Sequence, residues 1–347
     1  MNKTVLHFLN VGHGDCTIIE HASGRITMID INNSKSLSDK EVENLAAALG
    51  ISTWEFRTRG SLNAATGKSW EDFYKDKLVD PHEYFKSNFK DDSSVFRYIQ
   101  THPDMDHMSG LHRFFMQEKV PVWNFWDVAH AKTLLDVDFD KARYDWYDWE
   151  AYEKLRTGNG PDGKSHQVKN NLRFAKASYW SEDGISVLSP SQELIDFSDA
   201  KESWNNVSYV LRLDYGGRSV ILPGDAVQEA WAEVVDQVHP NLLNADILKA
   251  SHHGRKSGYH KDAVDIIKPH AVISSVGKKP ETDAHKDYKS HGAEVYSTRN
   301  KGTITVTIWE DGELWVQDSE KVKLTSLEPL QASSASLARS LFGANYV

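Results

Sequence analysis

Thr101-His102-Pro103-Asp104-Met105-Asp106-His107 is the stretch that decides the fold of this chain. Four of its residues, His102, Asp104, Asp106 and His107, are of the types that bind metal ions. In an extended loop alternate side chains point the same way, so positions 102, 104 and 106 share a face. The competing interpretation is an Asp-rich helix start, because aspartates cap helix N-termini.

Two later segments each run from an apolar strand into a ligand-type residue and a sharp turn. Residues 220–224 lead to Asp225, and residues 247–251 lead to His252 and His253. Taken singly, these could be a turn aspartate and surface histidines. Together with the 102–107 stretch they indicate a metal site at strand ends, with imidazole and carboxylate ligands that suit zinc, manganese or iron.

Composition sets the broad class. The chain has 347 residues, 39% hydrophobic and 26% charged, as expected for a globular protein of one large domain with insertions or of two domains. Its single cysteine, Cys16, excludes an intramolecular disulfide and a cysteine zinc finger. The absence of a long apolar run and of a signal-peptide pattern predicts a cytoplasmic protein without a membrane segment.

Strand-like runs open the chain and later alternate with helix-like runs, which predicts stacked sheets with helices outside. We expect strands over 5–11, 16–20, 26–31, 95–100, 207–215, 219–222, 245–250, 271–276, 294–297, 303–309 and 313–317. We expect helices over 38–49, 109–117, 228–238, 261–267 and 287–290. Residues 53–93 and 121–184 show no clear period and are expected to be irregular.

The second irregular region is rich in tryptophan. It carries Trp123, Trp126, Trp146, Trp149 and Trp180. The favoured interpretation is the aromatic core of a small cap, and the alternative is a surface that stacks nucleic-acid bases.

The segments above resemble the metallo-β-lactamase superfamily, and within it the hydrolase domain of the competence DNA-uptake protein ComEC and its stand-alone relatives. Further matching pieces are residues 8–15, Ile29-Asp30, 205–208 and 295–298 with Gly302. The resemblance implies an α/β fold, a metallo-β-lactamase αββα sandwich, over residues 1–327. It fails across about 36–93 and 117–184, which are interpreted as two inserted regions, and residues 328–347 are expected to form a peripheral tail.

The resemblance also implies two divalent metal ions, zinc or manganese. The implied ligands are His102 and Asp104 for one ion, Asp106, His107 and His252 for the other, and Asp225 as the bridge. The commoner family motif is H-x-H-x-D-H, so Asp104 replaces a histidine and favours manganese more than in a zinc lactamase. The family's third histidine of the first site has no clear counterpart; Asn205, Asn206 and His166 are candidates, and occupancy by a single metal stays open.

The same resemblance suggests catalytic roles for Asp106 and His253. Asp106 would help to hold metals that activate a bridging hydroxide. His253 would contact the substrate phosphate or protonate the leaving oxygen, unless it only packs in its turn. Asp30 could orient a ligand histidine, and His13 and His285 lie in segments that approach the site in the family.

The leading functional hypothesis is a metal-dependent hydrolase, a phosphodiesterase or nuclease. The formal net charge of −10 favours a nucleotide or single-stranded nucleic acid over a long duplex. One alternative is hydrolysis of a small ester, thioester or lactone, since fold alone does not fix the substrate. Another is a partner-dependent effector module of a bacterial defence system, with a protein partner docking on the Trp-rich insertion.

Overall fold

The chain folds around two stacked β-sheets. The computed structural model describes residues 1–33, 37, 39–58, 67–90, 92–137, 139, 144–176, 178–275 and 282–330. Within these residues a nine-stranded sheet has the order β15-β14-β13-β1-β2-β3-β4-β5-β6, and a six-stranded sheet has the order β12-β11-β10-β9-β8-β7. The expected tail at 328–347 lies, from residue 331 onward, outside the described residues.

The larger sheet contains β1 (Lys3–Phe8), β2 (Thr17–Glu20), β3 (Ile26–Ile29), β4 (Val95–Ile99), β5 (Val122–Asp127), β6 (Gln167–Asn170), β13 (Ile304–Trp309), β14 (Leu314–Gln317) and β15 (Lys323–Leu327). The smaller contains β7 (Ile185–Ser189), β8 (Val210–Tyr215), β9 (Arg218–Leu222), β10 (Ile247–Lys249), β11 (Ala271–Ser274) and β12 (Glu294–Ser297). The α-helices are α1 (Asp39–Leu49), α2 (Thr53–Thr58), α3 (Trp70–Lys75), α4 (Pro81–Asn88), α5 (Trp146–Arg156), α6 (Ser178–Asp183), α7 (Gln192–Lys201), α8 (Gln228–Gln237), α9 (Pro240–Leu243), α10 (Lys261–Ile267), α11 (His285–Ser290) and α12 (Thr298–Lys301). The 3₁₀ turns are η1 (Met105–His107), η3 (Leu134–Asp136), η4 (Pro161–Gly163), η5 (Trp204–Val207) and η6 (Ser251–Gly254), and η2 (His112–Gln117) is a π-helix.

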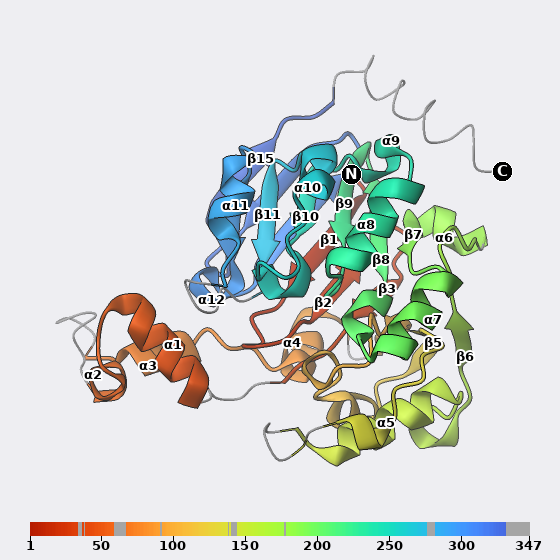
Figure 1. The fold of residues 1–347 in the computed structure, drawn as a ribbon, viewed down its shortest axis with the longest axis horizontal. Helices are drawn as coiled ribbons and strands as arrows, with labels where there is room; N and C mark the ends of the chain where they lie inside the picture. The colour runs from red at the N-terminus through yellow and green to blue at the C-terminus, as the bar shows by residue number, and fades with distance from the viewer. Residues whose placement is uncertain are drawn as a thin grey trace.

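Four layers result from the alternation of apolar residues along the strands. One buried cluster joins the inner faces of both sheets, for example Leu6 and Ile99 of the larger sheet with Leu222 and Ile273 of the smaller. A second cluster packs η2 and α5 on the outer face of the larger sheet, and a third packs α8, α10 and α11 on the smaller (Figure 1). This confirms the predicted αββα sandwich.

The two sheets present their strand ends to one edge. Strands β3, β4, β5 and β6 are parallel to one another, as are β9, β10, β11 and β12. Loops that leave the carboxyl ends of parallel strands meet at the same edge of a sheet, where functional side chains gather in such folds. The 102–107 loop follows β4, Asp225 follows β9 and the His252-His253 pair follows β10.

The region 53–93 is more helical than the sequence predicted. It contains α2, α3 and α4, and α1, α2 and α3 form a lobe with its own buried cluster, at the left of Figure 1. These short helices depend on end capping: Ser69 and Asp72 form a capping box for α3, and Asp80 with Pro81 begins α4. Capping acts at single residues, so a search for apolar periodicity does not detect it.

The expectation of an irregular region over 121–184 was also wrong in part. Strand β5 and helix α5 lie in it, and β5 is a buried member of the larger sheet. Trp126, Trp149 and Trp180 are buried, whereas Trp123 and Trp146 are exposed. Trp126 and Trp180 belong to the main core between the two sheets and Trp149 to the cluster on the outer face of the larger sheet, so these tryptophans do not form the core of a separate cap. The insertion boundaries at 36–93 and 117–184 stay a prediction.

None of the helices in the described part of the chain combines the length and the apolar character that crossing a bilayer requires.

Candidate metal centre

The loop after β4 is held in place by Asp30, the residue that follows β3. Asp30 accepts hydrogen bonds from the backbone N–H and the hydroxyl of Thr101, both at 2.7 Å, and its Oδ2 lies 2.7 Å from Nδ1 of His107. This fixes the His107 ring with Nε2 directed away from Asp30, 3.3 Å from Oδ2 of Asp225. A metal-binding histidine usually donates its other ring N–H to a carboxylate, which orients the ring. Orienting a ligand histidine is the role that the sequence suggested for Asp30.

Asp225 reaches the site through a tight turn after β9. Gly224 has φ +54°, and a Cβ there would lie 2.9 Å from the Thr101 side chain. Glycine therefore allows the β9 turn to approach the 102–107 loop. The Asp225 carboxylate is buried, and its Oδ1 has no hydrogen-bond partner in the described structure.

The turn after β10 directs two histidines differently. His252 and His253 both adopt left-handed backbone conformations, with φ +50° and +57°. His253 is fully buried, and its Nε2 lies 3.1 Å from Oδ2 of Asp225 and 3.2 Å from Oδ2 of Asp106. Nε2 of His252 lies farther from Asp225 Oδ2, at 3.8 Å.

The loop between β1 and β2 completes the cluster. His13 Nε2 lies 3.4 Å from Asp106 Oδ2, and Asp15 Oδ1 lies 3.5 Å from His253 Nδ1. Asp15 also accepts hydrogen bonds from the buried Lys249 ammonium and from Ser275. The sequence placed His13 near the site but gave Asp15 no role, although Asp15 stands in the quoted 8–15 segment.

Two overlapping groups of ligand atoms result, each with all atoms within 4.8 Å of one another. One consists of Asp15, His107, Asp225 and His253, and the other of His13, Asp106 and His253. Buried atoms that have no hydrogen-bond partner among the described residues, such as His107 Nε2 and Asp225 Oδ1, point to a missing positive partner. Carboxylate and imidazole atoms at this density fit a divalent metal ion.

The other half of the predicted site is poorer in ligands. His102 Nε2 lies 3.7 Å from Asp104 Oδ2 and has no hydrogen-bond partner in the described structure. Asp104 instead accepts a hydrogen bond from the ammonium of Lys132, whose side chain is almost buried and also lies 5.0 Å from the Trp204 ring centre. Two ligand-type residues and a cation fit a metal ion less well than the His107–Asp225–His253 half.

Two of the three candidates for a third ligand of this half, Asn206 and His166, are engaged elsewhere. Asn206 bonds Ser203 and Glu229 through its amide nitrogen and accepts from the backbone N–H of Ala230. His166 Nε2 lies 2.6 Å from the backbone oxygen of Leu155.

The acidic and basic groups of the cluster shift one another's pKa values toward their charged forms. Burial alone would raise the pKa values of Asp106 and Asp225, but the neighbouring histidines hold both well below the ordinary value. Burial opposes protonation of His253, yet Asp225 and Asp15 raise its pKa to about 10, and His107 is raised in the same way by Asp225 and Asp30. Metal binding must displace these protons, so it is coupled to pH.

The αββα sandwich with a His/Asp cluster at the strand ends defines the metallo-β-lactamase fold class. No known protein-family profile matches the chain. A stretch of 107 residues, 29% of this chain, is 36% identical to ComE operon protein 3 of Bacillus subtilis (strain 168) and spans 14% of that protein. This confirms the ComEC-like resemblance over that stretch. Among solved structures, the metallo-beta-lactamase fold protein YhfI from Bacillus subtilis aligns with 90% of this chain and 99% of its own, at a TM-score of 0.39 and 9% identity.

Proposed function

We propose that the chain is a metal-dependent hydrolase of phosphodiester bonds that acts on single-stranded nucleic acid or nucleotides. The observation that carries the proposal is the buried convergence of His107, Asp225 and His253 with Asp15, and the partly buried Asp106 beside His253, at the ends of β4, β9 and β10. The segment shared with ComE operon protein 3 is consistent with it.

The ligand set suits zinc or manganese, because it contains hard carboxylates, imidazoles and no thiolate. A divalent ion held there would polarise a phosphoryl oxygen and make bound water a nucleophile near neutral pH. The chain's own residues supply the rest: Asp30 fixes the His107 ring, and Asp106 and Asp225 provide anionic oxygens.

Arg255 supports an anionic substrate. Its guanidinium contacts His252 Nε2 at 3.1 Å and His13 Nε2 at 3.2 Å, and it makes no ion pair with any described carboxylate. A cation beside the cluster without a carboxylate partner is suited to a phosphate oxygen.

The two neighbouring histidines then take different roles. Burial lowers the pKa of His252 to about 4, so the ring is neutral; its Nε2 accepts from Arg255, and its Nδ1 lies 2.8 Å from the Ser257 hydroxyl. We propose that His253 is a metal ligand and that His252 positions Arg255 and the substrate, the reverse of the sequence-based roles.

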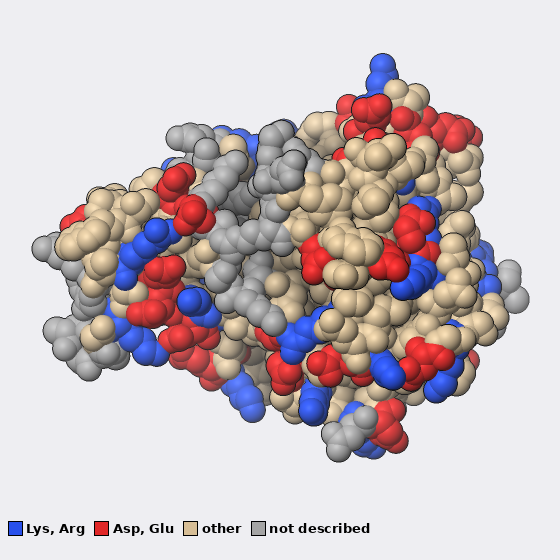
Figure 2. Space-filling view, turned by 90° about the horizontal axis from the view of Figure 1, so that it is seen from below, with Lys and Arg blue, Asp and Glu red and all other residues tan. Residues whose placement is uncertain are grey.

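The charge distribution favours a small or single-stranded substrate. Figure 2 shows acidic and basic side chains interspersed over the described residues of the face drawn, and acidic side chains are prominent on the lobe at the left. Binding of a long duplex depends on many phosphate contacts from Lys and Arg, which an acidic chain provides poorly.

The test is a screen of metals against substrates. With Mn²⁺ or Zn²⁺, the wild-type chain should cleave bis-p-nitrophenyl phosphate or labelled single-stranded DNA. Asp106→Ala and His107→Ala should abolish cleavage while the protein stays folded, and the exposed His239→Ala should behave as wild type. Full activity in both site variants would refute the site, and activity only on esters or thioesters would refute the substrate class.

A protein partner on the second insertion is a separate proposal. Leu134, Leu135, Trp146 and Tyr147 expose apolar side chains there, with Leu135 94% exposed. Exposed apolar groups of this size are common at docking surfaces. Proteins encoded by the genes next to the gene for this chain should co-elute with the wild type but not with the double variant Leu135→Ser/Trp146→Ser.

A further inference from the structure

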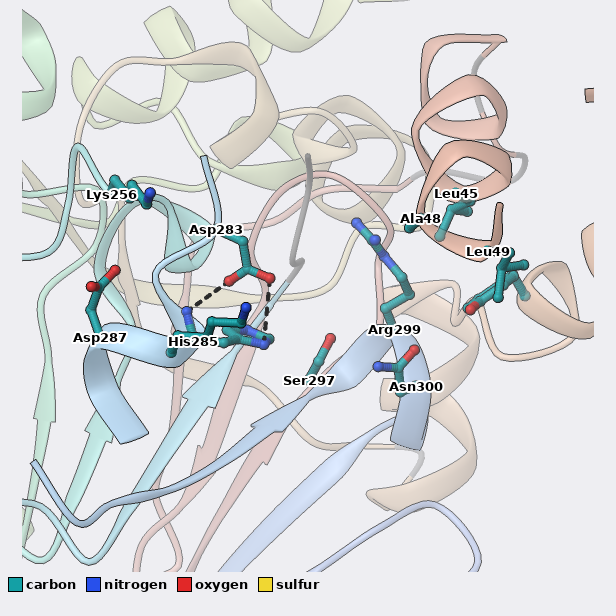
Figure 3. Close-up of a pocket in the computed structure, with 12 residues that line it drawn as sticks. Leu45, Ala48, Leu49, Lys256, Asp283, His285, Asp287, Ser297, Arg299 and Asn300 are labelled. Atoms are coloured by element: carbon teal, nitrogen blue, oxygen red, sulfur yellow. Dashed lines mark hydrogen bonds and ion pairs between the residues drawn. The ribbon is translucent and has the colours of Figure 1, made fainter. Parts of the chain in front are cut away.

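A cavity of about 480 Å³ lies between the α1–α3 lobe and the C-terminal elements α11 and α12. Its polar side is formed by residues from α11, the end of β12 and α12, and its apolar side by α1 and α3 (Figure 3). None of the expected metal ligands lines it.

The polar side has hydrogen-bonding capacity that the protein does not use. Ser297 is buried, and its hydroxyl has no hydrogen-bond partner among the described residues; the same holds for Nε2 of His285. Arg299 makes neither a hydrogen bond nor an ion pair with the described residues, and Figure 3 shows it extending between α12 and α1. Buried polar groups left without partners are uncommon, and a ligand is one reason for them.

The cavity also carries more unpaired positive than negative charge. Lys256 and Lys286 line it with Arg299, and none of the three forms an ion pair within the described structure. Two aspartates, Asp283 and Asp287, also line the cavity. Asp283 accepts a hydrogen bond from the backbone N–H of His285 at 2.8 Å and lies close to the His285 ring. Burial lowers the pKa of Arg299, partly offset by acidic groups nearby, so its charge is poorly solvated. An anion would offset that desolvation.

The opposite wall is apolar. Leu45, Ala48 and Leu49 come from α1 and Tyr74 from α3. A site with one cationic wall and one apolar wall fits a ligand that joins a phosphate to a flat or apolar group, as a nucleotide does.

A short series of contacts connects the cavity to the metal centre. Thr298, between Ser297 and Arg299, donates to the backbone oxygen of Ser275, and the Ser275 hydroxyl donates to Asp15. On the other side, Lys256 follows Arg255, which contacts His252 and His13. Neighbours of the lining residues Ser297, Arg299 and Lys256 therefore belong to, or contact, the residues around the metal centre.

We propose that this cavity binds a nucleotide unit next to the cleaved bond, with its phosphate on Arg299 and Ser297 and its sugar or base against Leu45, Leu49 and Tyr74. The assignment to the substrate rests on the proposed function. Binding of a nucleotide in the cavity does not depend on turnover.

The test measures equilibrium binding of thymidine 5′-monophosphate, which has no diester bond to cleave, to the full chain by calorimetry. Arg299→Gln should weaken binding at least about tenfold, because a charge-assisted hydrogen bond is lost. Ser297→Ala, which removes only a hydroxyl, should weaken it several-fold. Lys289→Gln, on α11 but outside the cavity, should bind as wild type does.

Wild-type affinity in both Arg299→Gln and Ser297→Ala would overturn the proposal. Melting temperatures near that of the wild type establish that the variants are folded, and Ser297→Ala gives the answer if Arg299→Gln unfolds.

A second arm separates a nucleotide from free phosphate. Wild type should bind the nucleotide more tightly than inorganic phosphate, and Leu49→Ser should reduce that preference without weakening phosphate binding. Equal affinity for the two ligands would overturn the nucleotide assignment.

The proposed function can fail independently of the cavity. If no metal supports cleavage of any diester while nucleotide binding still depends on Arg299, the phosphodiesterase proposal is wrong and the cavity is a nucleotide site of another activity.

Discussion

At the scale of residues, the surroundings of His252 and His253 are unlike although the two are adjacent. His253 is buried between Asp106 and Asp225, whereas His252 is partly exposed beside Arg255 and Ser257. Their left-handed backbone conformations turn the two rings in different directions. A sequence pattern identifies such a pair as a ligand segment but does not decide which ring is the ligand.

His253→Ala should therefore weaken metal binding much more than His252→Ala. We expect a loss of at least about tenfold in metal affinity for the first, since a direct ligand is removed, and a metal affinity close to wild type for the second. Titration of the metal-stripped proteins with Mn²⁺ measures both. A larger loss of metal affinity in His252→Ala than in His253→Ala would mean that His252 is the metal ligand, as the sequence suggested.

Lys132 gives a second prediction at this scale. Its ammonium compensates Asp104, so Lys132→Ala should leave a partly buried carboxylate beside His102 without a cation and raise the metal content by about one ion per chain. Elemental analysis after dialysis measures the ratio. Lys154→Ala, which removes an exposed lysine paired with Glu150, is the matched control. An unchanged ratio in Lys132→Ala would show that the lysine does not hold a metal position.

At the scale of elements, the β1–β2 turn depends on a glycine. Gly14 has φ +144°, and a Cβ there would lie 2.3 Å from the backbone oxygen of Asp106 and 2.6 Å from the Asn32 side chain. The turn and the 102–107 loop therefore approach as closely as their backbones allow, which brings His13 and Asp15 to Asp106.

Gly14→Ala should displace Asp106, abolish diester cleavage and lower the free energy of unfolding by about 2 kcal/mol or more. Gly24, at the turn between β2 and β3, also has positive φ but open space around it. Gly24→Ala should cost about 1 kcal/mol of backbone strain and keep the activity. Urea unfolding and a cleavage assay compare the two, and equal effects would mean that the close approach is unimportant.

Sequence patterns predicted the elements whose signal is periodic or local. The hairpin of β8 and β9 and the strand ends before Asp225 and His252 were found because apolar runs stop at marked turns. Strand β5 was missed because polar and exposed residues interrupt it, and α3 and α4 were missed because capping rather than periodicity defines them.

At the scale of the whole molecule, contacts between distant segments build the parts of the site that the sequence did not predict. Lys132 comes from residues 117–184, the second predicted insertion, and Asp15 accepts hydrogen bonds from Lys249 and Ser275 at the strand ends of the other sheet. The cavity joins α1 to α12 across most of the chain. Such pairings follow from the stacking of the sheets and leave no signal in any single segment.

Stability should fall in acid partly through His21. Burial lowers its pKa to about 4, and its Nε2 lies 2.9 Å from the Thr27 hydroxyl. In the unfolded chain His21 binds a proton near pH 6.5, whereas in the folded chain it stays neutral until the pH approaches 4. Its contribution to the free energy of unfolding is therefore complete above pH 6.5 and is lost as the pH falls toward 4. Between pH 6.5 and 4.5, wild type should lose about 2 kcal/mol more than His21→Gln in urea unfolding. Parallel pH profiles would contradict this.

We propose that the two ligand groups that share His253 bind divalent metal on which diester cleavage depends; His107 and Asp225 belong to one group and Asp106 to the other. The most direct test measures metal content and bis-p-nitrophenyl phosphate cleavage on the same preparations of wild type and His107→Ala. We expect the variant to be folded and to have lost both its bound metal and its cleavage activity. A His107→Ala protein that keeps both its metal and its activity would contradict it.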